Sequence, residues 1–296
     1  MPDRSDQPGD ILIIKLGAFG DVLIAQETIR VIRDRHPDSH ITAMTTPAYA
    51  YIMRRNPAIN RTITVQRKHR LLFWHLLRAR KAITQRQYDR VYDLQASSRT
   101  RLFRRWVRSD VAWTDGIIPA LGEGVPWFSN NALGWLADPV EQLLADNHVD
   151  QPFILLVPGS SANNAYKRWP FYNELAERLS EAGYLCVTAP GPDEIEDCRA
   201  MQATMLMVRD EDGRAKPVSI PQLAGVAQKA LYAIGNDTGP THLAALIGTP
   251  GVALFGSFTF PQQVGIDQVW PVLQAEQLDQ LTVQEVLDHV LSKLSR

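Results

Sequence analysis

The sequence predicts an α/β protein with two domains, each built around a doubly wound parallel sheet. Three observations support this prediction. Short apolar runs alternate with amphipathic segments of helical length along most of the chain. A Gly/Pro/Trp-rich stretch over 115–138 interrupts this alternation, which restarts at 153–157. The length of 296 residues exceeds the usual size of one hydrophobic core. We therefore expect domains at 1–145 and 146–296, joined near 140–152.

Short apolar runs bounded by polar turns predict the strands, and longer segments with helical periodicity predict the helices. In the first half we expect, in order, a strand at 11–14, a helix at 21–35, a strand at 41–44, a short helix at 49–55, a strand at 62–65, an Arg-rich helix at 71–86 and a strand at 90–94. In the second half we expect strands at 153–157, 185–188, 231–234 and 252–256, the last closing the sheet, and helices at 170–182, 220–229, from 240 onward and at 282–294.

The composition is that of an ordinary globular protein, with 45% hydrophobic and 21% charged residues. Two cysteines, Cys186 and Cys198, show no metal-ligand spacing with histidine, which favours a reducing compartment. The first ten residues are polar and do not resemble a secretory signal. No apolar run approaches the roughly 20 residues of a spanning helix. We expect a cytoplasmic protein.

The net charge of −1 conceals a strong asymmetry. Residues 1–110 hold 21 of the 31 basic and 10 of the 32 acidic residues, a balance of +11, so residues 111–296 carry −12. This segregation favours a polyanion or an anionic membrane surface as the partner of the first half, with a solvated basic face as the alternative. Nucleic acid is not expected, because no nucleic-acid-binding motif accompanies the charge.

The segment 235–242, Gly-Asn-Asp-Thr-Gly-Pro-Thr-His, is the most informative motif in the chain. It follows an apolar strand and precedes an apolar helix, so it is expected to form a tight polar turn. Pro240 suits the first helical turn, where its missing N–H would have no partner. The unpaired amides and the positive end of the helix dipole favour an anion such as phosphate. An ordinary capped helix is the alternative interpretation.

Two further segments are expected at the carboxyl ends of strands, where ligands bind in folds of this class. Residues 15–23 offer two glycines for a tight turn and Asp21 at a helix start, where capping is the alternative role. They do not spell G-x-G-x-x-G, which disfavours a dinucleotide. Residues 158–170 place hydroxyl groups after a strand and two cations before a proline, which suits a diphosphate. A surface loop with two exposed bases is the alternative.

A third strand end, 189–194, contains Glu194, which could accept hydrogen bonds from ribose hydroxyls or belong to the acidic first turn of a helix. The D-x-D spelling at 210–212 lies in a polar interval and is interpreted as a solvated loop. We expect no metal site, because Lys167 and the amides of the 237–239 turn can stabilise the charge of a leaving diphosphate.

Taken together, these segments resemble glycosyltransferase family nine, the lipopolysaccharide (ADP-heptose) heptosyltransferase type. The resemblance runs from residue 11 to about 257, and its most specific pieces are 20–23, 167–170 and 237–242. It implies the GT-B architecture, in which an acceptor-binding and a nucleotide-sugar-binding Rossmann-like domain face a central cleft. It also implies an inverting, metal-independent transfer of a sugar, with heptose expected, from an ADP-linked donor.

The resemblance assigns roles to individual residues. Asp21 matches the family's proposed general base, and Lys167 matches the lysine that contacts the donor diphosphate. Both are expected to be catalytic, the second by stabilising the leaving group. Val218 falls where an apolar residue lies against adenine. The implied donor-binding residues are Ser160, Ser161, Lys167, Glu194, Val218, Asp237, Thr238, Gly239 and His242.

On the acceptor side, the resemblance implies an anionic, lipid-linked glycan of the lipopolysaccharide core, which suits the basic first half. Arg67, Lys68 and Arg70 are the candidate acceptor contacts. The ADP-sugar is a co-substrate, and no cofactor is expected. A peripheral contact with the cytoplasmic face of the inner membrane is compatible with such an acceptor.

The chain departs from the family pattern where Glu27 replaces a usual proline and where Ala96 replaces the glycine of an Asp-x-Gln-Gly segment. Two other functions remain open. A sugar-nucleotide epimerase of similar fold would need acid–base groups around the sugar ring. A non-catalytic nucleotide-sugar or polyanion-binding protein would not need Asp21. The presence of Asp21, Lys167 and His242 in segments that follow separate strands disfavours both.

Overall fold

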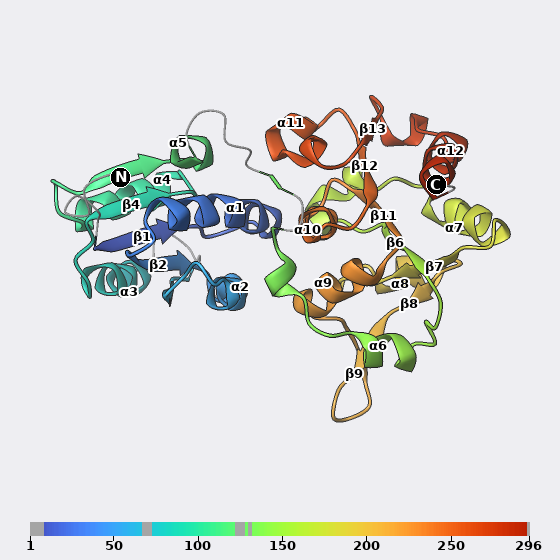
Figure 1. Cartoon of the computed structure of the whole chain (residues 1–296), viewed down its shortest axis with the longest axis horizontal. Helices are drawn as coiled ribbons and strands as arrows, with labels where there is room; N and C mark the ends of the chain where they lie inside the picture. The colour runs from blue at the N-terminus through green and yellow to red at the C-terminus, as the bar shows by residue number, and fades with distance from the viewer. Residues whose placement is uncertain (1–8, 67–72, 122–127, 130–131, 295–296) are drawn as a thin grey trace. The chain divides into compact units, whose positions relative to one another are not determined.

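The computed structural model describes residues 9–66, 73–121, 128–129 and 132–294, and the chain divides into two compact units, 1–127 and 128–296 (Figure 1). This division precedes the expected boundary at 145/146, because the intervening segment packs on the second unit. The Leu133 amide donates to the Leu246 carbonyl at 3.1 Å, and the Asp138 amide donates to the Pro221 carbonyl at 2.9 Å. Backbone hydrogen bonds thus make these residues part of the second unit.

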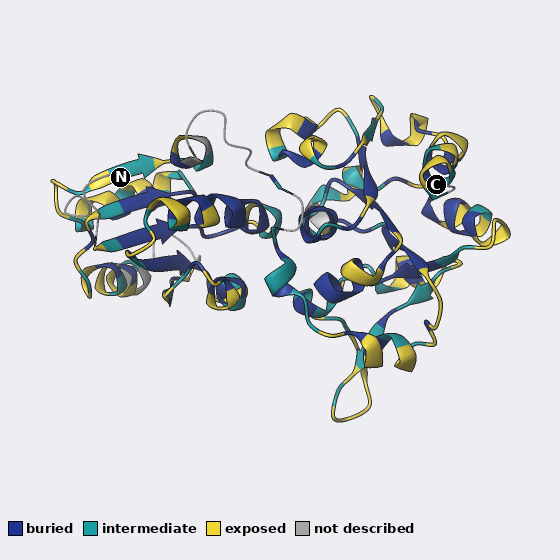
Figure 2. Ribbon diagram, in the orientation of Figure 1, coloured by how far each residue is buried: buried dark blue, intermediate teal, exposed yellow. Residues whose placement is uncertain are grey.

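In the described part of the first unit, a parallel sheet has the strand order β3-β2-β1-β4-β5. Its strands are β1 (Asp10–Ile14), β2 (His40–Thr45), β3 (Arg61–Thr64), β4 (Arg90–Asp93) and β5 (Ala112–Asp115). Its helices are α1 (Phe19–Arg35), α2 (Ala50–Arg55), α3 (Phe73–Thr84), α4 (Ser98–Phe103) and α5 (Ile117–Leu121). The central strand β1 is buried, as its apolar run predicts (Figure 2). β5 was not expected, because this edge strand is only partly buried and carries little apolar signal.

In the described part of the second unit, a parallel sheet has the order β13-β12-β11-β6-β7-β8. Its strands are β6 (Phe153–Val157), β7 (Leu185–Thr188), β8 (Thr204–Met205), β11 (Tyr232–Asn236), β12 (Gly251–Phe255) and β13 (Val272–Gln274), and β9 (Met207–Arg209) and β10 (Ala215–Pro217) form a separate hairpin. Its helices are α6 (Glu141–Asp146), α7 (Tyr172–Glu181), α8 (Ile195–Arg199), α9 (Ile220–Lys229), α10 (Gly239–Ile247), α11 (Pro261–Val264) and α12 (Val283–Leu294). The expectation that the strand at 252–256 closes the sheet was wrong, because β13 pairs outside it. β13 is too short and too exposed for a periodic signal.

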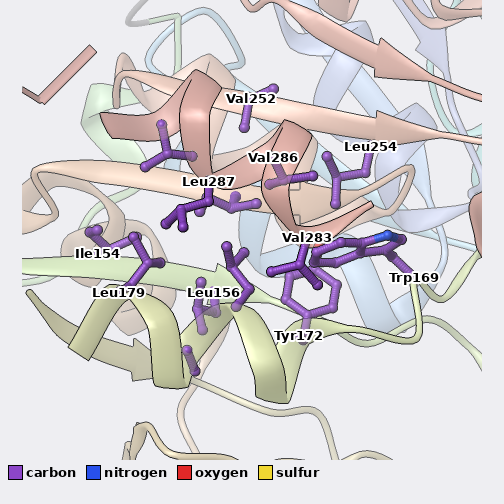
Figure 3. Close-up of a cluster of buried hydrophobic side chains, with 14 of the residues drawn as sticks. Ile154, Leu156, Trp169, Tyr172, Leu179, Val252, Leu254, Val283, Val286 and Leu287 are labelled. Carbon is purple, nitrogen blue, oxygen red and sulfur yellow. The ribbon is translucent and has the colours of Figure 1, made fainter. Parts of the chain in front are cut away.

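One face of the second sheet packs against α7 and α12 (Figure 3). Alternate strand residues, such as Ile154 and Leu156, point into this core, since successive side chains on a strand face opposite sides. On β11, Gly235 allows close packing with α10, because a Cβ there would lie 2.2 Å from Thr241 Oγ1. This close approach positions the turn that joins β11 to α10.

No helix in the described ranges combines the length and the apolar character needed to cross a bilayer.

Candidate active site

The turn after β11 lies within the carboxyl edge of the second sheet. β11 is flanked by β12 on one side and by β6 on the other, and β7 follows β6. Because these strands are parallel, the segments that follow them leave the sheet at the same edge. The fold therefore brings the 237–242 turn, Lys167 after β6 and Glu194 after β7 to one edge.

Asn236, the last residue of β11, ties this edge together. Its side chain is fully buried, and its Nδ2 donates to the carbonyl of Pro158 at 2.6 Å. Its Oδ1 accepts from the Trp169 amide at 3.2 Å and from the Tyr172 hydroxyl at 3.3 Å. One amide thus fixes both ends of the segment that carries Lys167. This role of Asn236 was not predicted from the sequence, although a polar residue that ends a buried strand is a usable signal.

Asp237 is the centre of a buried charge cluster. Its Oδ2 accepts a hydrogen bond from Lys167 Nζ, and its Oδ1 lies 3.3 Å from His242 Nε2. Burial by itself raises the pKa of Asp237, but the hydrogen bonds from His242 and Lys167 outweigh it and lower the pKa to about 2. Asp237 is therefore ionised at neutral pH and holds the Lys167 ammonium beside the turn that leads into α10.

This depressed pKa makes a stability prediction with a defined sign. The pKa of Asp237 is lower in the folded state than its ordinary value of 3.8. Ionised Asp237 therefore stabilises the folded state fully above about pH 4, and this contribution to the free energy of unfolding is lost as the pH falls toward 2. We expect Asp237→Asn to lower the free energy of unfolding by about 2 kcal/mol at pH 7. Urea unfolding at several pH values would measure this difference, which should shrink below pH 4. A difference independent of pH would contradict the ionic origin of the effect.

The first turn of α10 has the chemistry of an anion site. Thr238 is the N-cap, but its side chain makes no capping hydrogen bond and instead lies 3.3 Å from Thr241 Oγ1. Gly239 and Pro240 begin the helix, and the amides of a first turn lack intrahelical partners. The amides of Gly239 and Thr241 and the helix dipole thus favour a negative charge beside Lys167.

The two serines after β6 occupy different environments. Ser160 is buried, and its hydroxyl donates to the Asn164 carbonyl at 2.8 Å, while Arg168 donates to the Ser160 carbonyl at 2.8 Å. Ser161 is exposed, and its Oγ accepts from Asn164 Nδ2 at 3.0 Å. Arg168 also pairs with Asp197 at 2.8 Å. In this arrangement Ser160 and Arg168 brace the loop, and Ser161 lies at its surface.

Glu194 covers the start of the same loop. Its Oε2 accepts from the Gly191 amide at 2.9 Å, and a Cβ on Gly159 would overlap its carboxylate at about 2 Å. Glu194 is also the N-cap residue of the short helix α8, directly before the acidic first turn that holds Glu196 and Asp197, and a contact with ribose stays a prediction. Val218 lies half-buried between β10 and α9.

In the first unit, the segment after β1 presents Asp21. This residue is exposed in the first turn of α1, and its Oδ2 accepts from the Ala18 amide at 3.0 Å. The capping interaction considered from the sequence is therefore present. It engages one carboxylate oxygen and leaves the side chain open to solvent, so capping and proton acceptance are compatible.

The loop before α1 rests on the segment after β4. Gln95 Oε1 accepts from the amides of Leu16 and Gly17 at 2.9 and 3.1 Å. Lys15 is buried and donates to the Leu94 carbonyl at 3.2 Å. Burial lowers the pKa of Lys15, while the charges of Asp21 and Asp93 oppose that shift. Neither Lys15 nor the role of Gln95 was anticipated, because both depend on β1 and β4 being neighbours.

The two departures from the family pattern have structural correlates. Ala96 has a φ of +45°, in the region that favours glycine, so the family glycine would suit this backbone better. Glu27 is buried on α1 and pairs with Arg30 at 2.5 Å, which satisfies its charge.

The proposed acceptor contacts Arg67, Lys68 and Arg70 lie outside the described residues. The described part of the first unit does carry exposed basic side chains nearby in sequence. They occur on α3 and on the segment from α4 onward, namely Arg78, Arg80, Lys81, Arg101, Arg104 and Arg105.

Two further features of the second unit lie outside the site. The D-x-D motif at 210–212 lies in the turn between β9 and β10. Its first residue, Asp210, pairs with Lys216 at 2.9 Å and accepts hydrogen bonds from the amides of Asp212 and Arg214. Cys186 and Cys198 are buried thiols without a disulfide.

The chain is similar in sequence and in fold to known glycosyltransferases. Residues 132–275 match the family model of glycosyltransferase family 9 (heptosyltransferase). The chain is 22% identical over 306 residues to lipopolysaccharide heptosyltransferase 3 of Escherichia coli, covering 85% of this chain and 86% of the relative. Its fold is similar to a family 9 glycosyl transferase from Veillonella parvula, with a TM-score of 0.78, 21% identity and 97% of each chain covered. It is also similar to an E. coli heptosyltransferase solved with ADP-2-deoxy-2-fluoro heptose, with a TM-score of 0.66, 18% identity, and 96% and 99% of the two chains covered.

The family match and the relatives agree with the resemblance found in the sequence motifs, and the solved structures agree with the two α/β units described above. The chain is therefore a glycosyltransferase with the GT-B architecture, and it is similar to the heptosyltransferases of family 9.

Proposed function

We propose that this protein is an inverting glycosyltransferase that moves a heptose from an ADP-linked donor to an anionic glycan of the lipopolysaccharide core or a related lipid-linked glycan. The observation that carries the proposal is the Lys167–Asp237–His242 cluster beside the first turn of α10. The similar E. coli structure with ADP-2-deoxy-2-fluoro heptose supports the choice of donor.

The donor diphosphate would bind at the first turn of α10. Lys167 has three N–H donors, so it can keep Asp237 as a partner and still donate to a phosphate oxygen. Together with the amides of Gly239 and Thr241, it would stabilise the charge that develops on the diphosphate as the bond to the sugar breaks. Ser161, Glu194 and Val218 would contact the remainder of the nucleotide.

Asp21 would act as the general base. In a single displacement, the acceptor hydroxyl oxygen bonds to the anomeric carbon, the bond from that carbon to the diphosphate oxygen breaks, and the hydroxyl proton passes to the Asp21 carboxylate. Its exposure in the first turn of α1 supports this role.

We propose that the reaction uses no metal and no cofactor beyond the ADP-sugar co-substrate, because Lys167 and the α10 amides supply positive charge at the leaving group. The protein would act at the cytoplasmic face of the inner membrane, since its proposed acceptor is lipid-linked.

The direct test is incubation with ADP- and UDP-linked sugars and a lipopolysaccharide-core acceptor, with chelator present, following nucleotide release and acceptor mass. We expect ADP release coupled to a heptose-sized mass gain. Release that requires a divalent metal would contradict the metal-independent mechanism, and binding without transfer would favour a non-catalytic binding protein.

The acceptor side makes a separate prediction. Replacing Arg67, Lys68 and Arg70 together by glutamine should raise the KM for an anionic acceptor and flatten its salt dependence, because fewer charges would be screened. The donor KM should hardly change. Steady-state kinetics at several salt concentrations would measure both constants. The matched control replaces three exposed basic residues of the second unit by glutamine, namely Arg199, Lys229 and Lys293, and should leave both KM values unchanged. Equal effects on both substrates would indicate a folding defect instead.

A further inference from the structure

Two exposed aromatic side chains meet beside the Lys167–Asp237 pair. Tyr166 is 50% exposed and Phe258 is 70% exposed, and their ring centroids lie 4.9 Å apart in an edge-to-face arrangement. Phe260, two residues further along, is 56% exposed. Exposed aromatic groups that cluster in this way commonly mark a binding site.

The fold places this pair on a defined side of the proposed phosphate site. Tyr166 directly precedes Lys167, and Phe258 follows β12. The two rings line one small hollow of about 10 Å³ together with Lys167 and Asp237. β12 and β6 lie on opposite sides of β11, and Glu194 follows β7, beyond β6. The Phe258 segment therefore leaves the sheet on the side of the Asp237 turn opposite to Glu194.

The chemistry of the pair suits a sugar ring. The negative face of an aromatic ring attracts weakly positive hydrogens, and one face of a pyranose presents several C–H groups. Glu194 and Val218 are the proposed nucleoside contacts, so the opposite side of the diphosphate site is where the sugar of a donor would extend. Tyr166 is also anchored, since its hydroxyl lies 3.4 Å from Asn164 Oδ1.

We propose that Tyr166 and Phe258 form a stacking subsite for a pyranose ring. This inference rests on the proposed function, because it takes its orientation from a nucleotide diphosphate bound at Lys167 and α10. Two sources can supply the ring, the donor's own sugar and the terminal sugar of the acceptor, and both present the same C–H face to the aromatic pair.

The test compares Phe258→Ala and Tyr166→Ala with the parent protein in three measurements: calorimetric affinity for ADP, calorimetric affinity for ADP-heptose, and acceptor KM. If the donor sugar stacks, ADP affinity stays unchanged while ADP-heptose binding weakens roughly 3- to 10-fold. If the acceptor sugar stacks, both affinities stay unchanged while the acceptor KM rises by a similar factor. Phe258→Tyr should keep parental behaviour because it retains the ring face.

Leu231→Ala is the matched control, since this exposed apolar residue precedes β11 at the opposite end of that strand. Parental values in all three measurements for both alanine variants would overturn the subsite while leaving the proposed function standing. An equal loss of ADP and ADP-heptose affinity would also overturn it, because the rings would then support the phosphate site. Failure of the parent protein to bind ADP and ADP-heptose would overturn both proposals.

Discussion

Asp21→Asn is expected to lower kcat roughly 100- to 10,000-fold, the usual contribution of a positioned general base. Asparagine has nearly the same shape and can still accept the Ala18 amide hydrogen bond through its side-chain oxygen, but it cannot take up the acceptor proton. Donor affinity and Tm should therefore remain close to the parent values, since asparagine suits a helix N-terminus about as well as aspartate. Turnover, calorimetric ADP affinity and thermal melting, measured on the same preparations, would check this.

Asp34→Asn is a matched control on the same helix, because Asp34 lies exposed in the last turn and pairs with Arg30 at the surface. It should leave turnover unchanged. If Asp21→Asn retained near-parental transfer, Asp21 would be a helix cap, and the proton acceptor would have to be sought elsewhere.

Lys167→Ala is expected to weaken ADP binding by about 1.5–3 kcal/mol, which corresponds to roughly 10- to 150-fold in Kd. Two effects contribute to this loss of affinity. The variant lacks the charge-assisted hydrogen bond from Lys167 to the phosphate, and the Asp237 carboxylate, which Lys167 neutralises in the structure, then repels the diphosphate. Calorimetry in the presence of chelator measures the change. Lys229→Ala, which removes an exposed lysine paired with Glu141 in the same unit, should leave ADP affinity unchanged.

A second substitution separates the two contributions of Lys167. If this lysine acts only by neutralising Asp237, adding Asp237→Asn to Lys167→Ala should restore ADP affinity. If Lys167 donates to the phosphate itself, the double variant should remain weak. Full restoration would therefore contradict the direct contact that the proposed mechanism requires.

Much of the fold could be predicted because its strands are strongly apolar and its helices have clear boundaries. The runs at 11–14 and 153–157 became the buried strands β1 and β6, and Pro240 lies in the first turn of α10. β5 and β13 could not be predicted, because both are short, partly exposed strands whose positions depend on pairing with a neighbour.

The candidate site likewise has features that the sequence predicts and features that depend on the tertiary structure. The sequence by itself determined the local chemistry: a helix N-terminus at 238–241, a lysine two residues before Trp169, and a carboxylate in the first turn of α1. These features follow from adjacent residues. Only the tertiary structure decided that Lys167 pairs with Asp237, that Asn236 holds the two segments together, and that Tyr166 meets Phe258. Those contacts join residues far apart in the chain, and they form because the parallel order of β12, β11 and β6 brings their carboxyl ends to one edge.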